Sequence, residues 1–426
     1  MTTNSKNAKH LVNLYTHSKS FDEVLGDIKQ KDPGALPDAP KLPESNTWSD
    51  EAKQSRIDLL KTHLSASLAH LSGEEHNYHA EYYKGNIENF IGLTKIPTGV
   101  IGPLFISGTE ARGDFFVPLA TTEGALVASY NRGAKATRLS GGITAVCTTE
   151  GLQRTPVWKF DTLVEVGQFI YWLLPQIDKF KEIVSAHSRY AVLQDVKLNM
   201  EGNNVLSVFE YTCGEAAGQN MVTICTEAVC QYILQNSPVK PNYWFVESNY
   251  SGDKKATAVS FTSVRGKKVT AEAIVKRKVV ADVLKSTPED IAIYWQTSMV
   301  AAAQSGSIGL QGHIANGLTA LFMACGQDVA CVSEAYVGIT RMEVDRHEDL
   351  YVSLTLPSLV VGTVGGGTSL PTQNECLELI GCKGKNSARK FAEICTAVAL
   401  AGELSIAAAL ASGRFSKAHQ VFRRKV

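Results

Sequence analysis

The sequence lacks the features that mark several classes of protein. Its first residues, Met1 to Ser5, contain no hydrophobic core of the kind that directs secretion. No unbroken run of Lys and Arg is longer than three residues, and 42 basic residues balance 42 acidic ones. Neither nucleic acid nor an anionic membrane surface is therefore an expected partner. No GxGxxG fingerprint follows a strand-like segment, so spacing alone identifies no dinucleotide site.

Paired cysteine spacing is also missing. The chain has nine Cys, an odd number, and none of them form a CxxC motif or a Cys/His set with zinc-finger spacing. This usage favours free thiols in a reducing compartment. We therefore expect a cytoplasmic protein without a metal site.

Charge is absent from one long stretch. From Ile291 through Gln327 there is no Asp, Glu, Lys or Arg, and His313 is the only His. Recurring glycines make the stretch a poor lipid-facing surface but let neighbouring backbones approach closely, which favours a buried central helix. Asp328 follows directly. It is either an N-cap for the next element or a carboxylate whose raised pKa is useful in an apolar site.

The chain is long enough for two or three domains. Residues 1–50 are polar and proline-punctuated, so we predict little regular structure there. Ser49 or Asp50 is a plausible cap for a helix through about His70. We predict a strand at Phe115 to Leu119 and a small-residue helix at Ala125 to Ala136.

Glu123 lies between these two apolar segments. A buried Glu must be neutral or paired, because an unpaired buried charge is costly. Capping of the following helix is the alternative explanation.

Residues 156–246 resemble a separate module. Strand-like runs at 155–160, 190–200 and 205–212 surround a helix at about 162–174, which Pro175 is expected to stop, and a second helix follows at 221–234. This order is typical of a ferredoxin-like unit, and the whole chain is predicted to be α+β. The turn from Gly214 to Met221 would offer backbone N–H groups to an anion such as a pyrophosphate.

Further motifs lie in the second half of the chain. The Asn249 to Ala256 loop carries Asp253, Lys254 and Lys255 and is either a solvated loop or the source of a cation for a developing oxyanion.

Residues 350–356 are predicted to form a strand, and 362–368 a loop that permits close backbone approach. Asn386 and Ser387 are predicted to cap a long alanine-rich helix to Ala411. His419 lies in the basic tail, where a histidine is often merely solvated.

Together, five segments resemble the 3-hydroxy-3-methylglutaryl-coenzyme A reductase family, in order and with similar spacing. The resemblance runs from about Glu88 to Arg424 and is closest to the soluble first class. The segments are Glu88-Asn89-Phe90-Ile91-Gly92, Thr121-Thr122-Glu123-Gly124, Asp253-Lys254-Lys255, Gly326-Gln327-Asp328 and Gly362-Thr363-Val364-Gly365-Gly366-Gly367-Thr368.

The resemblance implies an N-terminal region over residues 1–87, partly irregular and then helical. It implies a large substrate, CoA and catalytic domain over 88–155 and 247–426, built around a central helix from Met299 to Cys325. Residues 156–246 would be the inserted NADP-binding domain. Active sites would form between two subunits of a dimer, with Glu88 to Gly92 at the contact.

The resemblance also implies roles for individual residues. Two NADPH would reduce an acyl-CoA thioester, through a hemithioacetal and an aldehyde, to the alcohol mevalonate. Lys254 would stabilise the carbonyl oxygen, and Glu123 would be the acid with a raised pKa. Asp328 would hydrogen-bond both of them and hold Glu123 protonated. His419 would protonate the departing thiolate.

Binding residues are implied in the same way. The substrate would contact Arg154, Asp253, Lys255 and Asn316. CoA would contact Ser129, Asn131, Arg132 and Lys285. NADPH would contact Ser188, Arg189, Glu215, Gly218, Asn220, Met221, Val364, Gly365 and Arg424.

Three positions depart from the family pattern. Glu215 replaces an Asp. Glu247 stands where a Ser contacts the terminal carboxylate of the substrate, and the Lys that pairs with that carboxylate is missing, because Ser298 or Gln296 falls at its place. The carboxylate pocket is thus two charges more negative, and a lost pair of this kind would cost roughly 1.5–3 kcal/mol. A reductase of another acyl-CoA is therefore a second hypothesis.

Two further hypotheses come from other classes. A thiol acyltransferase would use Cys147, Cys213 or Cys325 as its nucleophile. A non-catalytic binding protein on the same fold is the last alternative, although the retention of Glu123, Lys254, Asp328 and His419 together argues against it.

Overall fold

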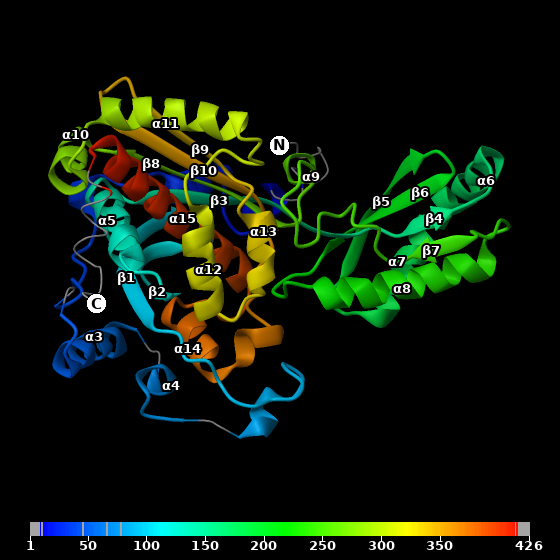
Figure 1. The fold of residues 1–426 in the computed structure, drawn as a ribbon, viewed down its shortest axis with the longest axis horizontal. Helices are drawn as coiled ribbons and strands as arrows, with labels where there is room; N and C mark the ends of the chain where they lie inside the picture. Colours follow the sequence, from blue (N-terminus) through cyan, green and yellow to red (C-terminus); the bar gives the residue numbers. More distant parts are fainter. Residues whose placement is uncertain are drawn as a thin grey trace.

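The computed structural model describes residues 9, 12–44, 47–64, 67–76, 79–413 and 415, and shows a mixed α/β fold. Figure 1 shows two lobes. The small lobe (residues 157–245, from β4 to β7) extends to one side, and the large lobe comprises the other described residues. The domain boundaries drawn from the sequence stay a prediction.

The elements are best given in chain order. The strands are β1 (Thr98–Gly108), β2 (Arg112–Ala120), β3 (Ile143–Arg154), β4 (Val157–Lys159), β5 (Val192–Glu201), β6 (Asn204–Thr212), β7 (Tyr243–Phe245), β8 (Gly266–Val275), β9 (Ile339–Val344) and β10 (Leu350–Leu359). The α-helices are α2 (Phe21–Ile28), α3 (Asp50–His63), α4 (Ala69–Ser72), α5 (Leu126–Leu139), α6 (Leu163–Leu173), α7 (Ile177–His187), α8 (Gln219–Asn236), α9 (Val259–Thr262), α10 (Arg277–Val279), α11 (Pro288–Gln304), α12 (Ile314–Ala324), α13 (Val332–Ala335), α14 (Pro371–Leu379) and α15 (Ser387–Ala411). Short 3-10 turns include η5 (Val329–Cys331) and η6 (Gly366–Ser369).

One strand, β3, takes part in the sheets of both lobes. In the large lobe the strand order is β2-β1-β3-β8-β10-β9, in which β1 and β3 run parallel and the other neighbours antiparallel. The far end of β3, at Leu152 to Arg154, pairs instead with β6 of the small lobe. The end of β3 therefore carries Arg154 to the place where the lobes meet.

The small lobe has the strand order β7-β4-β6-β5, with all neighbours antiparallel. With α6 and α7 after β4 and α8 after β6, this is the order of a split βαβ unit. The expectation that Pro175 stops the helix that begins near Thr162 is confirmed, because α6 ends at Leu173. A further helix that was not predicted, α7, begins at Ile177 after the 3-10 turn that contains Pro175.

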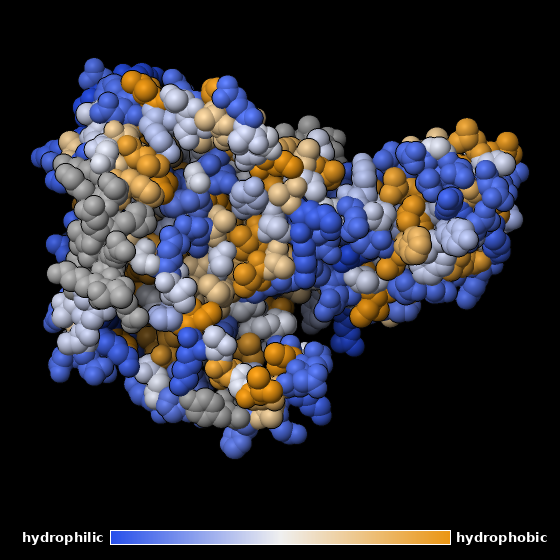
Figure 2. Space-filling model, in the orientation of Figure 1, coloured by the Kyte–Doolittle hydropathy of each residue, from blue (hydrophilic) through white to orange (hydrophobic). Residues whose placement is uncertain are grey.

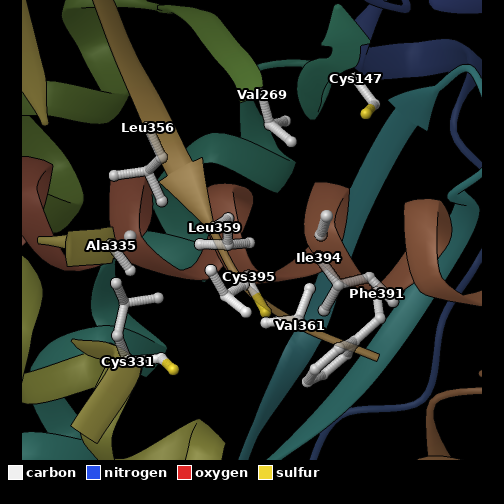
Figure 3. Close-up of a cluster of buried hydrophobic side chains, with 14 of the residues drawn as sticks. Cys147, Val269, Cys331, Ala335, Leu356, Leu359, Val361, Phe391, Ile394 and Cys395 are labelled. Carbon is white, nitrogen blue, oxygen red and sulfur yellow. The ribbon is translucent and has the colours of Figure 1, made fainter. Parts of the chain in front are cut away.

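The core of the large lobe is α15. Its predicted extent, from Ser387 to Ala411, is confirmed, and it packs against α5, β8 and β3. Figure 3 shows Phe391, Ile394 and Cys395 of this helix among side chains from the sheet. Among the described helices, α15 alone is long and apolar enough to cross a membrane, but 83% of its apolar window is buried within the protein. Burial of this extent is that of a core helix.

The central uncharged stretch is not one helix, so the expected helix from Met299 to Cys325 is wrong. It forms α11 and α12, separated by residues 305–313. Gly306 and Gly309 in this break have φ of +77° and +100°, a region that disfavours other residues. The buried carboxylate of Glu403 also accepts backbone N–H groups at the end of the break. The long buried helix of the fold is α15.

The N-terminal region contains a helix that the sequence analysis missed. Ser20 and Glu23 form a capping box at the start of α2, a signal that was present in the sequence. The predicted cap of α3 at Ser49 is confirmed, although α3 ends at His63 rather than near His70. Residues 30 and 31, just after α2, bond to the turn between α5 and β3 at Ser140 and Gly141 and to β8 at Ile274.

A buried acid lies on α15 beneath the N-terminal region. The carboxylate of Glu393 accepts hydrogen bonds from the Thr109 hydroxyl and from the backbone N–H groups of Glu110, Ala111 and Cys147. Burial raises the pKa of Glu393 to about 7, although these donors act in the opposite direction.

We expect this group to make stability fall as pH rises. Between its ordinary pKa of 4.5 and about 7, folded Glu393 keeps a proton that the unfolded chain has lost. Its contribution to the free energy of unfolding therefore declines by about 1.4 kcal/mol per pH unit over this window. Urea unfolding at pH 5, 6, 7 and 8 measures the slope, and Glu393→Gln should remove this contribution. Identical slopes in the two proteins would contradict the assignment.

Candidate active site

Lys254 and Asp328 form an ion pair, with 2.9 Å between Nζ and Oδ2. The other carboxylate oxygen, Oδ1, accepts the N–H of Ala330 at 3.0 Å and caps η5. The N-cap hypothesis for Asp328 is therefore confirmed, and the other oxygen faces the ammonium of Lys254. The alternative of a carboxylate kept in an apolar site is wrong, because the side chain of Asp328 is 42% exposed. The hydrogen bond that Lys254 donates to Asp328 raises the pKa of Lys254, which keeps this half-exposed side chain charged.

The backbone at Lys254 is unusual, with a φ of +54°. A non-glycine residue in this region carries conformational strain, and such residues concentrate at functional sites. The preceding Gly252 also has a positive φ, and its carbonyl accepts the N–H of Lys255. The loop is thus a tight, strained turn that presents Lys254 to Asp328, although Lys254 and Lys255 are both exposed.

Buried ion pairs anchor this loop. Asp253 contacts Arg265 at 2.5 Å and Arg154 at 3.2 Å, and Arg265 also contacts Glu334 at 3.1 Å. Burial opposes ionisation of Asp253, but the two guanidinium groups hold its pKa below the ordinary value. Arg265 and Glu334 are almost fully buried and were missed by the sequence analysis, because no local motif marks a pair 69 residues apart.

Glu123 lies elsewhere on the large lobe. It is exposed, and its Oε1 accepts a hydrogen bond from Asn316 Nδ2 at 3.3 Å. It does not cap the following helix, whose N-cap is Ala125. The contact with Asn316 brings together two residues that the sequence analysis assigned to the site.

The predicted contact between Asp328 and Glu123 is not made within the single chain, and between two subunits it stays a prediction. Among the described residues, Glu123 makes no hydrogen bond to Asp328 or to Lys254. The reason is α12, because Asn316 lies in the first turn of this helix and Asp328 lies four residues beyond its end. One chain thus presents an acid at one end of α12 and a cation at the other.

Glu247 has several partners of its own. Its Oε2 contacts Arg154 at 3.1 Å and accepts from the Ser251 hydroxyl at 3.1 Å, while Oε1 accepts the N–H of Asn249 at 2.8 Å. The negative charge that Glu247 adds, where the family pattern has a Ser, is therefore compensated within the chain by Arg154. Ser298, by contrast, lies on α11.

The predicted CoA residues mostly have partners within the chain. Ser129 and Arg132 both bond to Ser405 of α15, and the carbonyl oxygen of the Asn131 side chain accepts the N–H of Gly102. These contacts fix α5 on the core. Lys285 is exposed at the end of the α10 region.

The predicted cofactor residues fall into two groups. Ser188 and Arg189 line an open hollow of about 630 Å³ on the small lobe, together with Lys181. Gly218 is the left-handed N-cap of α8, whose first turn contains Asn220 and Met221 and has no side-chain cap. Neighbouring backbone N–H groups in this turn are therefore available to an anion.

Glu215 does not face this turn. Its carboxylate accepts the backbone N–H groups of Asn386 at 2.6 Å and Ala388 at 2.7 Å, so it caps α15. The adjoining Ala216 forms a β-bridge with Val364, which precedes Gly365 in the glycine loop. Glu215 thus fastens the turn before α8 to the core of the large lobe. His419 and Arg424 lie outside the described residues.

The thiols do not resemble nucleophiles. All nine Cys are free and buried. Burial raises the pKa of Cys147 and of Cys213 to about 12 and that of Cys325 well above its ordinary value. A thiol acyltransferase needs an accessible thiolate, which these positions do not supply. Among the described residues, no group of three or more His, Cys, Asp or Glu is arranged to hold a metal ion.

Comparison with known proteins gives one consistent result. The family model described as hydroxymethylglutaryl-coenzyme A reductase matches residues 52–424. The 3-hydroxy-3-methylglutaryl-coenzyme A reductase of Aeropyrum pernix is 44% identical over 350 residues, which cover 81% of this chain and 83% of that protein. The enzyme of the same name from Pyrococcus abyssi is 42% identical over 380 residues, covering 88% of this chain and 93% of that one.

A solved structure resembles the fold. The class II 3-hydroxy-3-methylglutaryl-CoA reductase from Streptococcus pneumoniae, bound to NADPH in open conformations, superposes with a TM-score of 0.70 at 21% identity. The superposition covers 87% of this chain and all of the other. From the family model and the sequence relatives, the chain belongs to the hydroxymethylglutaryl-coenzyme A reductase family of oxidoreductases.

Proposed function

We propose that the protein catalyses the NADPH-dependent four-electron reduction of 3-hydroxy-3-methylglutaryl-CoA to mevalonate and CoA. The observation that supports this most strongly is the Lys254–Asp328 pair at 2.9 Å, held on a strained turn that buried arginines anchor. Reduction of a thioester places negative charge on the carbonyl oxygen, and an ammonium fixed in advance stabilises that charge.

Each residue of the pair has a separate task. Lys254 would donate a hydrogen bond to the oxygen that gains charge, and Asp328 would hold the ammonium in place and charged. Glu123, oriented by Asn316, would supply a proton to that oxygen. His419 would protonate the CoA thiolate.

A dimer would complete the site. In one chain Glu123 and Lys254 lie at opposite ends of α12, so a second subunit would bring the two halves together. The irregular segment 84–97 supports this arrangement, because Ile87, Ile91 and Leu93 are 53%, 102% and 46% exposed. Apolar side chains gather at the surface in this part of the molecule (Figure 2). Uncovered apolar segments of this kind mark protein contacts.

The residues present fit a dinucleotide phosphate. The uncapped first turn of α8, after Gly218, suits a pyrophosphate, and a Cβ at Gly218 would lie 2.5 Å from the sulfur of Cys213. Arg189 and Ser188 in the small-lobe hollow would bind a 2′-phosphate, which favours NADPH over NADH. When bound, the nicotinamide supplies hydride. Val364, 52% exposed, and Gly365 would line its site from the large lobe, with Arg424 from the tail.

The CoA moiety would bind along α5. Ser129, Asn131 and Arg132 are fixed on α15 and β1, so they would present a rigid surface, and exposed Lys285 would meet a CoA phosphate. We further propose a cytoplasmic location, consistent with nine free thiols.

A second candidate is a reductase of the same family that acts on a different acyl-CoA. The observation in its favour is the Arg154–Glu247 pair, because Arg154 is 6% exposed and already shares its charge with Glu247 and Asp253. A substrate carboxylate arriving at Arg154 would meet a guanidinium that two internal carboxylates compensate. Lys255 remains as an exposed cation beside this cluster.

The Glu247→Ser variant tests whether Glu247 weakens the recognition of a substrate carboxylate by Arg154. Removal of the internal carboxylate frees Arg154, so kcat/KM for acyl-CoA thioesters with a terminal carboxylate should rise about tenfold relative to uncharged thioesters. Steady-state NADPH oxidation with a panel of both kinds of thioester measures the ratio, and Glu210→Ser, which removes a carboxylate of the small lobe, is the control. A high specificity constant of the wild-type enzyme for 3-hydroxy-3-methylglutaryl-CoA would exclude the second candidate. No NADPH oxidation with any thioester would exclude both.

A further inference from the structure

A buried carboxylate on the core helix holds the start of α12. Glu403 is 2% exposed and accepts three hydrogen bonds, from the N–H of Gly312 at 2.5 Å, the N–H of His313 at 2.6 Å and Nδ1 of His313 at 3.0 Å. A buried carboxylate persists only when donors surround it. All three donors belong to the two residues that precede α12, so the core helix fixes both the backbone and the ring there.

The imidazole of His313 is held on its face as well. It stacks on Tyr130 with ring centroids 5.5 Å apart and an interplanar angle of 21°. Tyr130 in turn is wedged between Gly317 and Gly402, where an added Cβ would lie 2.3 Å from the tyrosine ring. Rotation of the imidazole would break a hydrogen bond to a buried acceptor, and the ring is therefore confined.

This fixed point connects to the candidate acid. Asn316 follows His313 by three residues, its backbone N–H donates to the carbonyl of His313 at 3.0 Å, and its Nδ2 donates to Glu123 at 3.3 Å. We propose that His313 is a positioning residue of the active site. Glu403 orients the ring of His313, and His313 sets the direction of Asn316 and hence of Glu123. The inference rests on the proposed function, in which Glu123 supplies a proton.

Two conservative variants distinguish positioning through the Glu403 bond from other roles. The amide nitrogen of asparagine lies near the place of histidine Nδ1, so His313→Asn keeps a donor for Glu403. The amide of the longer glutamine overlays Nε2 instead, so His313→Gln leaves that carboxylate oxygen without its side-chain donor. The variants differ by one methylene and carry the same amide.

The expected results are specific. His313→Gln should lower kcat about tenfold or more, because a displaced acid loses its alignment, while KM for NADPH and for the acyl-CoA changes less than about twofold. His313→Asn should retain kcat within about threefold of the wild type. Asn316→Ala should lower kcat about as much as His313→Gln, and the double variant should lose no more than either, because the residues act in series. A kcat of His313→Gln equal to the wild type, an equal loss in His313→Asn, or losses that multiply would overturn the proposal.

One readout does not depend on turnover. Nuclear magnetic resonance of ¹⁵N-histidine protein should show a ring N–H that is protected from solvent exchange and that disappears in His313→Asn. Absence of this signal in the wild-type protein would overturn the proposal. Wild-type protein that shows the signal but oxidises no NADPH would refute the proposed function while leaving the Glu403–His313 bond established.

Discussion

Lys254→Ala should lower kcat by about 10²–10³-fold while NADPH still binds with unchanged affinity. The side chain removed is the ammonium that Asp328 holds at 2.9 Å, and a fixed donor to a developing oxyanion has an effect of this size. The loss is expected in kcat because the oxygen carries full charge only during the reaction. Steady-state NADPH oxidation gives kcat, and quenching of protein fluorescence gives the affinity for NADPH.

Lys255→Ala, one residue along, is the matched comparison. Its Nζ donates to the carbonyl of Asp253 on the surface of the same loop, so this variant should raise KM for the acyl-CoA with a much smaller effect on kcat. Lys61→Ala, which breaks an ion pair on α3, controls for loss of surface charge. Undiminished turnover in Lys254→Ala, or equal losses in the two loop variants, would remove Lys254 from the role assigned to it.

Arg265→Met should lower the free energy of unfolding by about 3–5 kcal/mol. Arg265 is 3% exposed and is the ionic partner of Glu334, which is fully buried, and of Asp253. The variant leaves a buried carboxylate without its cation, which is strongly destabilising. Burial already raises the pKa of Glu334, and loss of the Arg265 charge should raise it further. Urea unfolding followed by circular dichroism measures the change.

Two controls make this result specific. Arg341→Met removes an exposed arginine that pairs with Glu343, and should change stability by less than about 1 kcal/mol. The double variant Arg265→Met with Glu334→Leu removes both charges and should recover much of the loss, because no buried charge then remains unpaired at that position. A loss below about 1 kcal/mol in Arg265→Met would show that the network does not anchor the loop.

The parts of the fold that follow local rules were predictable. The alanine-rich run to Ala411 forms α15, and Ser49 caps α3. The order strand, helix, two strands, helix in 157–245 also followed from composition and turn residues, although α7 and β7 were not predicted. Each of these signals lies within a few residues of its effect. The capping box of Ser20 and Glu23 was equally local and was simply missed.

The parts that depend on distant residues were not predictable. The break before α12 exists because Glu403, ninety residues later, binds the N–H groups of Gly312 and His313, and no pattern near residue 312 reveals this acceptor. Glycine spacing alone indicated one continuous buried helix. The compensation of Glu247 by Arg154 depends on a pair 93 residues apart.

The candidate site was predicted by resemblance and only partly by chemistry. The Lys254–Asp328 pair was expected and is present, and Asn316 joins Glu123. The predicted link from Asp328 to Glu123 is not made within one chain, because α12 separates them. A sequence specifies which residues a site contains more readily than which subunit contributes each.

The stoichiometry of turnover is the most direct test of the central claim, that the pair of Lys254 and Asp328 serves a thioester reductase. Purified protein would be given limiting 3-hydroxy-3-methylglutaryl-CoA and excess NADPH, with oxidation of NADPH followed by absorbance and free CoA by thiol titration. We expect two NADPH to be oxidised for each CoA released. Release of CoA without NADPH oxidation, or a lasting ratio of one to one, would contradict it.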